Sequence, residues 1–248
     1  MPGLPFFLGA LRGRMLRHLA SSALLLLPAM QLQAQQRIYN LNGSFADVNG
    51  GPSLSPIGSG VLTANGYTFG VNQGLSLTGV VGSTYTIALR FSFDAVTGYR
   101  RIIDYKNRSS DTGVYNYAGQ AEFFPYLLAP NVVYAPGQLA LSIFTRDAAG
   151  LFSAYVDGVP QYSFLDTQND AIVDASNTVI FFQDDLVVAN EASSGFVNYI
   201  ATWDRALTAQ EAGAFLQPGV VPEPASLALV AVGLAGVLAV VRRRKGSR

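Results

Sequence analysis

The chain of 248 residues contains no cysteine, so an exported domain of this length would depend on its hydrophobic core rather than on disulfides. The only histidine, His18, lies near the N-terminus, and no histidine follows it. These absences exclude Ser-His-Asp and Cys-His nucleophilic catalysis and typical zinc sites from the rest of the chain. Carboxylates are the acid–base and metal-binding groups that remain.

Net charge is also lacking, because 16 basic residues balance 16 acidic ones. The balance comes from the two ends. Between Gln35 and Val221 there are eight basic and 15 acidic residues, which gives 8 − 15 = −7. A negative surface disfavours nucleic acid, whose binding depends on neutralising phosphates. It is compatible with Ca²⁺ or with a neutral polysaccharide.

An apolar run near the C-terminus, residues 225–241, contains no charged residue. As a helix it would be about 25 Å long, at the short end of what crosses a bilayer. Arg242, Arg243, Arg244 and Lys245 follow it. Because basic residues stay on the cytoplasmic side, everything before Pro222 is expected in the opposite compartment.

Val221, Pro222, Glu223 and Pro224 precede this run. The four residues, the short apolar helix and the arginine-rich end together resemble the PEP-CTERM sorting signal of Gram-negative bacteria. The resemblance implies that an exosortase, a membrane-embedded protease-transpeptidase, cuts near Pro-Glu-Pro and passes the protein to the outer surface, for work in the extracellular polymer matrix. It assigns residues 218–248 to the signal. The alternative is an ordinary C-terminal anchor behind a proline-rich linker.

The N-terminal end also predicts export. Arg12, Arg14 and Arg17 precede an apolar stretch of residues 19–29, and the small residue Ala34 follows. This order is typical of a secretory signal peptide, here residues 1–34, with signal peptidase cutting after Ala34. Met15 is an alternative start. The domain is therefore expected first in the periplasm, held by the C-terminal helix, and then at the cell surface or outside the cell.

Residues 36–217 are expected to form one all-β antiparallel sandwich. Residues 84–93 alternate so that Tyr85, Ile87, Leu89, Phe91 and Phe93 share one face, which indicates a half-buried strand. Asp157-Gly158 indicates a tight hairpin turn. Thr208 and Glu211 form a capping box that begins a short helix, about Ala209–Leu216. Further strands are expected at Leu75–Leu77, Tyr99–Tyr105, Val114–Phe124, Gln138–Thr145, Leu151–Val156, Gln161–Phe164, Thr178–Phe182 and Phe196–Trp203.

Short segments of this region resemble the laminin-G-like, concanavalin-A-like jelly-roll superfamily. They are residues 141–147, the hairpin Tyr155-Val156-Asp157-Gly158, residues 181–185, and residues 195–200 leading to 203–208. The resemblance implies two packed antiparallel sheets, often a Ca²⁺ site at the rim, and frequent glycan or protein binding. The same sandwich carries lectins, hydrolases and adhesive modules, so the fold alone does not assign a function.

The densest group of oxygen ligands is Asp184, Asp185, Asn190 and Glu191. Such a loop offers the hard oxygen atoms that Ca²⁺ requires. The alternative is an ordinary turn, because aspartates at strand ends accept backbone amides. No D-x-D-x-D-G ladder is present. The sequence leaves both readings open.

The most aromatic stretch contains Tyr115 and Tyr117, which share a strand face, with Asn116 and Gln120 as neighbouring polar groups. Exposed rings stack on sugars, and these amides could bind sugar hydroxyls. Aromatic residues also supply sandwich cores, which is the expectation for Phe123 and Phe124. The single tryptophan, Trp203, is expected to pack under the helix.

The sequence leaves three candidate functions for the β-sandwich domain. The first is a non-catalytic module that binds a glycan or another protein. The second is a divergent glycosidase or lyase, which needs two carboxylates on one face. No Glu-x-Asp-x-x-Glu string is present, and Glu122 with an aspartate is the pair that remains. The third is a passive structural module at the cell surface.

Overall fold

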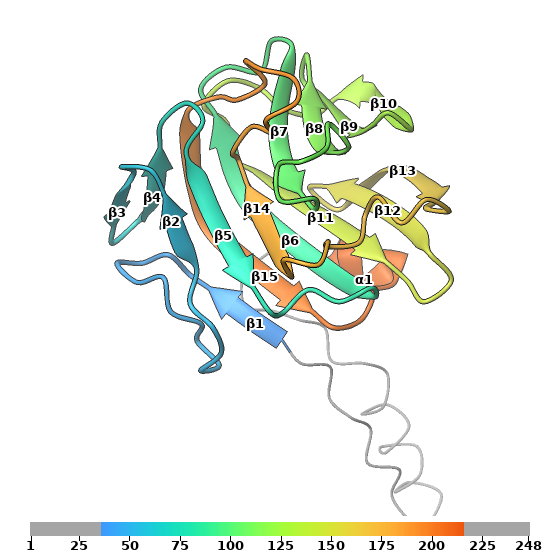
Figure 1. Cartoon of the computed structure of the whole chain (residues 1–248), viewed down its shortest axis with the longest axis horizontal. Coiled ribbons are helices and arrows are strands. Elements are labelled where there is room, and N and C mark those ends of the chain that lie inside the picture. The colour runs from blue at the N-terminus through green and yellow to red at the C-terminus, as the bar shows by residue number, and fades with distance from the viewer. Residues whose placement is uncertain (1–35, 216–248) are drawn as a thin grey trace, which may run out of the picture. The chain divides into compact units, whose positions relative to one another are not determined.

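The computed structural model describes residues 36–215, which form two antiparallel β-sheets and one short helix (Figure 1). The expected signal peptide, the sorting motif and the apolar run 225–241 lie outside the described residues. Within residues 36–215, no helix has the length and apolar character needed to cross a membrane.

The first sheet has eight strands, in the order β13-β12-β11-β6-β15-β4-β3, and β1 also pairs with β15. Their bounds are β1 Gln36–Tyr39, β3 Val61–Thr63, β4 Gly66–Phe69, β6 Tyr85–Phe93, β11 Ala140–Arg146, β12 Leu151–Val156, β13 Val159–Leu165 and β15 Gly195–Trp203. The second sheet has seven, in the order β10-β9-β8-β7-β14-β5-β2. These are β2 Ser55–Ile57, β5 Gly74–Thr78, β7 Tyr99–Asp104, β8 Gly113–Tyr117, β9 Gln120–Phe124, β10 Leu127–Val132 and β14 Thr178–Phe181.

The core between the sheets is rich in aromatic rings. Phe69 stacks on Phe182 at 4.5 Å between ring centroids, and Phe123 meets Phe152 edge-on at 4.9 Å. Such pairs add to the free energy gained from burying their area. The all-β sandwich of jelly-roll type expected from the sequence is confirmed.

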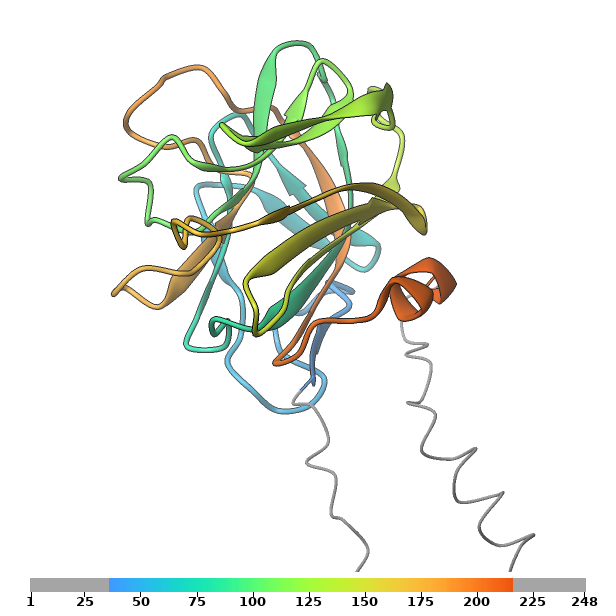
Figure 2. The same cartoon turned by 90° about the vertical axis from the view of Figure 1, so that its right-hand side faces the viewer.

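A second, smaller core lies on the other face of the eight-stranded sheet, under helix α1 (Ala209–Ala214). Thr208 caps the helix and accepts a hydrogen bond from the Glu211 amide, while the Glu211 side chain accepts one from the Thr208 amide. Trp203 meets Phe215 edge-on at 5.6 Å. The capping box and the packing of Trp203 are therefore as expected, and Figure 2 shows α1 on the outside of the strands.

This second core corrects one expectation. Strand β6 is buried on both faces rather than half-buried, because Ala88 packs in the smaller core while Ile87 and Leu89 face the larger one. The expected run 114–124 is also two strands, β8 and β9, joined by a turn in which Ala118 and Gly119 have positive φ.

Candidate ligand-binding face

Arg101 on β7 is fully buried and is the cation of an ionic cluster that consists of Arg101, Asp104, Asp111 and Asp185. Its guanidinium donates to Asp185 and to the Thr112 carbonyl, and it lies 3.3 Å from Asp104 and 3.6 Å from Asp111. We call this group the Arg101 cluster. Breaking a buried pair of this kind leaves an uncompensated charge, so the cluster fixes the loops that carry its acids.

Two neighbours of Arg101 fit its planar side chain. The guanidinium carbon lies 4.3 Å from the centre of the Tyr115 ring, within the range of a cation–π contact. On Gly113, a Cβ atom would come within 2.7 Å of Arg101 Nη1 and of the Ile103 carbonyl, at a φ of +156°. Glycine therefore lets β8 approach the buried cation closely.

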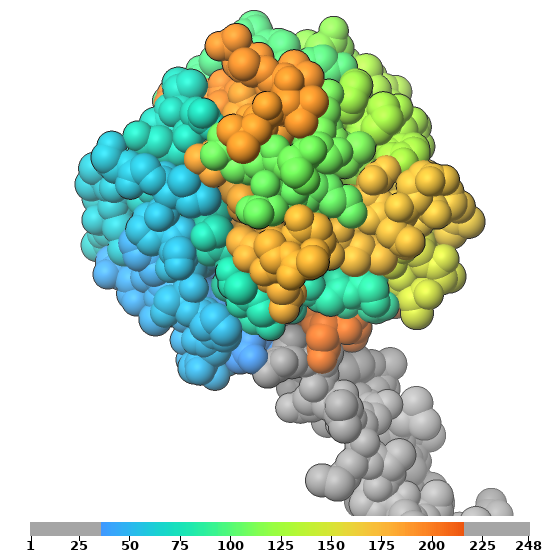
Figure 3. Space-filling view, viewed as in Figure 1, coloured from blue at the N-terminus to red at the C-terminus, as the bar shows by residue number. Residues whose placement is uncertain are grey.

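The aspartates that follow β14 hold the loop between β14 and β15. Asp185 Oδ1 accepts the amides of Val187 and Val188, and Asp184 accepts those of Asp185 and Glu191. The space-filling view in Figure 3 shows this loop as the orange surface at the top, beside green segments of the seven-stranded sheet. These bonds support the turn reading of Asp184-Asp185.

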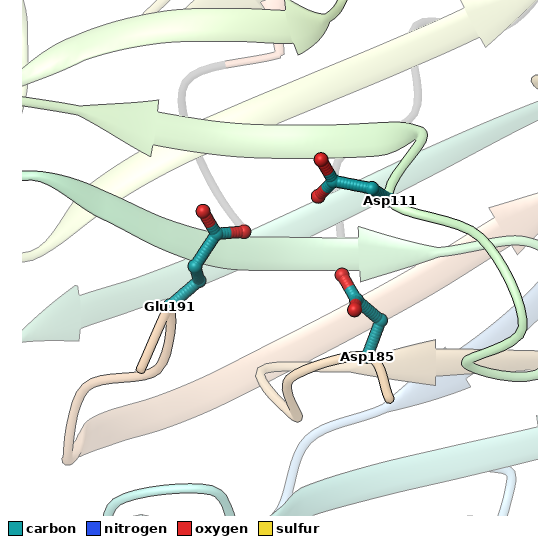
Figure 4. A group of neighbouring side chains, drawn as sticks. All are labelled: Asp111, Asp185 and Glu191. Atoms are coloured by element: carbon teal, nitrogen blue, oxygen red, sulfur yellow. The ribbon is translucent and has the colours of Figure 1, made fainter. Parts of the chain in front are cut away.

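Of the four expected calcium ligands, the structure brings Asp185 and Glu191 together, and Asp111 joins them. One carboxylate oxygen from each of the three lies within 4.8 Å of the others (Figure 4). Asp184 lies outside this group of three carboxylates. Asn190 has an exposed side chain, and its carbonyl accepts a hydrogen bond from Arg100.

The hydrogen bonds of this group fit Ca²⁺ poorly. Ca²⁺ takes six to eight oxygen ligands, yet Asp185 is used by Arg101 and two amides, and Asp111 accepts from the Tyr115 hydroxyl. The one buried oxygen of the three acids without a partner is Glu191 Oε2. Arg101 already occupies the place of a cation. Calcium binding here stays a prediction of the sequence.

Strands β7, β8 and β9 present aromatic rings on the face that points away from the core between the sheets. Tyr99 and Tyr117 lie 4.4 Å apart between ring centroids, and Phe124 lies 5.7 Å from Tyr99. These three side chains are half-buried, so part of each ring is open to solvent. We call this surface the β7–β9 face. Its members are Tyr99, Tyr115, Tyr117, Gln120, Glu122 and Phe124, because Tyr115 pairs with Glu122 and Tyr117 with Gln120.

The ligand residues expected from the sequence divide between two faces. Tyr117 and Gln120 are half-buried on the β7–β9 face, and Tyr115 on the same face is fully buried. Asn116 is buried on the opposite side, where its amide donates to the Val96 carbonyl and accepts from the Gly119 amide. Asn116 therefore shapes the β8–β9 turn instead of facing a ligand.

Two glutamates beside these rings are unusual. Burial raises the pKa of Glu122 to about 7, and its Oε2 is buried without a hydrogen-bond partner. Burial, and then the charge of Asp111, raises the pKa of Glu191 to about 7. Burial and the nearby charge of Glu122 also raise the pKa of Tyr99. Carboxyl groups with raised pKa values beside these half-buried rings make the β7–β9 face the candidate site.

Sequence reasoning did not single out Arg101 or the pairing of Tyr99 with Tyr117. The period of two did carry a signal, because residues 115 and 117 on one strand and 120 and 122 on the next face the same way. The position of Tyr99 beside Tyr117 depends on the pairing of β7 with β8 and on a β-bulge between Arg101 and Ile103. No local sequence pattern reveals either feature.

Comparison with known proteins agrees with this fold and with the C-terminal signal. Residues 220–245 match the family described as PEP-CTERM protein-sorting motif. Domain 4 of AbnA, an extracellular GH43 arabinanase from Geobacillus stearothermophilus solved with arabinotriose, is similar at 17% identity and a TM-score of 0.54, covering 74% of this chain and 99% of that domain. No curated protein matches the sequence.

Two larger proteins contain a similar sandwich. Trypanosoma rangeli sialidase gives 16% identity and a TM-score of 0.57 over 73% of this chain and 32% of its own. A structure of botulinum neurotoxin type C, whose cell entry depends on interaction with two ganglioside molecules, is also similar. It shares 12% identity at a TM-score of 0.56, over 74% of this chain and 50% of its own. This chain thus spans about a third of the sialidase chain and about half of the neurotoxin chain. Identities this low show the fold alone. The chain carries a PEP-CTERM protein-sorting motif behind a two-sheet antiparallel β-sandwich.

Proposed function

We propose that this protein is displayed at or released from the cell surface and that its sandwich binds a glycan through the β7–β9 face without cleaving it. The sorting motif supports an exosortase-sorted surface protein, exported and anchored through its C-terminal region. Signal peptidase and an exosortase would then be its processing partners, and an extracellular polysaccharide its ligand.

The observation that carries the proposal is the set of partly open rings of Tyr99, Tyr117 and Phe124 on one face. Sugar rings have apolar faces that stack on aromatic side chains, and polar groups beside the rings fix orientation. Gln120 and the two perturbed glutamates provide such groups. The arabinotriose complex of the similar AbnA domain is consistent with a glycan ligand for this fold.

The test uses purified residues 36–215, which contain both hydrophobic cores. We expect retention of this protein on a polysaccharide array, and loss of most of it in Tyr117→Ala. Tyr126→Ala is the matched control, because Tyr126 is also partly exposed, at 38%, but lies outside the face. Absence of any retention would contradict the proposal and favour the passive structural module. Equal loss of retention in both variants would show that the β7–β9 face is not the binding site.

A glycosidase or lyase is the second candidate, favoured by Glu122 and Glu191. Both lie near Tyr99, and a carboxyl group with a pKa near 7 can act as a general acid at neutral pH. Incubation with the polysaccharide that is retained, followed by measurement of reducing ends and of unsaturated products, separates the two. Product formation that disappears in Glu122→Gln would establish the enzyme and overturn the non-catalytic role.

A further inference from the structure

Among residues 36–215, the acids at the β7–β9 face outnumber the nearby cations, because Arg101 is shared among several of them. Glu122 and Glu191 border the face, and Asp111 lies beside Glu191. Besides burial, these three carboxylates and Tyr117 raise the pKa of Tyr99. Glu122 Oε2 and Glu191 Oε2 are buried without a hydrogen-bond partner, so each would have to turn outward to accept a hydrogen bond from a ligand.

The neighbouring arginines are used elsewhere. Arg101 is fully buried in its cluster. Arg100 alternates with Tyr99 and Arg101 along β7, so it points to the opposite side, and it donates to the carbonyls of Tyr99 and Asn190. Arg108 donates to the Asp184 carbonyl. These contacts turn the guanidinium groups of all three arginines toward oxygen atoms of the protein itself.

This charge distribution selects among glycans. A uronate, sulfate or sialate would place its negative charge beside Glu122, Glu191 and Asp111 and would be repelled. A neutral sugar could stack on the rings and donate hydroxyl hydrogen bonds to the acids, but it would not compensate their charge. An ammonium group uses both kinds of neighbour, because it binds carboxylates through charge-assisted hydrogen bonds and is attracted to tyrosine rings.

We propose that the ligand is a glycan with free amino groups, a polymer of partly or fully de-N-acetylated amino sugars, held by stacking on Tyr99 and Tyr117 with its ammonium groups at Glu122 and Glu191. This inference rests on the proposed glycan-binding function and specifies its ligand class. Residues 36–215, with a net charge of 8 − 15 = −7, are electrostatically suited to a cationic polymer.

The test compares two matched oligosaccharides by titration calorimetry with residues 36–215: a glucosamine hexamer and the N-acetylglucosamine hexamer, which differ only in the acetyl groups. An oligogalacturonate is the anionic probe. We expect the glucosamine hexamer to bind at least about tenfold more tightly than its acetylated counterpart, and the galacturonate not to bind.

Variants distinguish the face from general attraction to an acidic protein. Glu191→Gln should remove most of the preference for the glucosamine hexamer over the acetylated hexamer. If Glu191→Gln does not fold, Glu122→Gln provides the same measurement. Asp204→Asn removes the same charge from an exposed site outside the face and should leave binding unchanged. Equal losses in all three variants would overturn the inference.

The two proposals fail separately. Equal or tighter binding of the acetylated hexamer, or binding of the galacturonate, would overturn the amine preference while leaving a glycan-binding face. Absence of binding by all three probes and on the polysaccharide array would overturn both proposals.

Discussion

Replacing Glu122 with glutamine isolates the cost of a buried carboxylate. In the folded protein the pKa of Glu122 is raised from 4.5 to about 7 by burial. The folded state therefore binds the proton more tightly than the unfolded state does. Stability from this group is fully present below pH 4.5 and falls as pH rises toward 7. At 1.36 kcal/mol per pKa unit the loss reaches at most about 3 kcal/mol.

The assay is urea unfolding of residues 36–215 between pH 5 and 8, for the natural sequence and for Glu122→Gln. Glutamine cannot ionise, so we expect the variant to gain stability relative to the natural protein as pH rises, by up to about 3 kcal/mol at pH 8. Glu191 titrates in both proteins and cancels in the difference.

Glu211→Gln is the control with the opposite sign. Its pairing with Arg205 lowers the pKa of Glu211, so its contribution is present above pH 4.5 and is lost only as pH falls through the lower folded value. Between pH 5 and 8 this variant should be less stable by a constant amount. A difference between natural and Glu122→Gln protein that does not change with pH would refute the reasoning about Glu122.

Three further outcomes test other parts of the structure. Arg101→Met leaves Asp185 buried without its cation, so it should lower the free energy of unfolding by about 3–5 kcal/mol and weaken glycan binding. Arg146→Met breaks the buried ion pair with Asp166 and should lower stability without changing binding. Unchanged binding in both variants would show that the β7–β9 face does not depend on the Arg101 cluster. Phe215→Ala should cost about 3 kcal/mol by emptying the core under α1, measured by urea unfolding. Millimolar Ca²⁺ or chelator should leave the melting temperature unchanged, and a rise equivalent to about 2.7 kcal/mol at a hundredfold excess over the dissociation constant would restore the calcium prediction.

Local signals in the sequence predicted much of the fold. The strand predicted from the alternation of residues 84–93, the Asp157-Gly158 hairpin and the capping box of Thr208 each depend on neighbouring residues, and all appear in the structure. Strands β1 to β4, each of three or four residues, were not predicted, and neither was β10, which contains Pro130.

The site was predicted less fully, since it depends on contacts distant in sequence. The period of two placed Tyr115 and Tyr117 on one face correctly, yet it could not tell that Asn116 would be enclosed at a turn. The partner of Asp185 is Arg101, 84 residues earlier. No residue near Asp185 in the sequence indicates that its counter-ion is a guanidinium group rather than a metal ion.

The position at which the described fold ends has a consequence for maturation. Phe215 packs on Trp203, and Pro222 follows only seven positions later, a distance of at most about 25 Å for extended chain. Among the described residues, the members of both hydrophobic cores lie between Ile38 and Phe215. Cleavage at Pro-Glu-Pro would therefore leave every one of them on the released module, and we expect that module to melt at the same temperature as the uncut precursor.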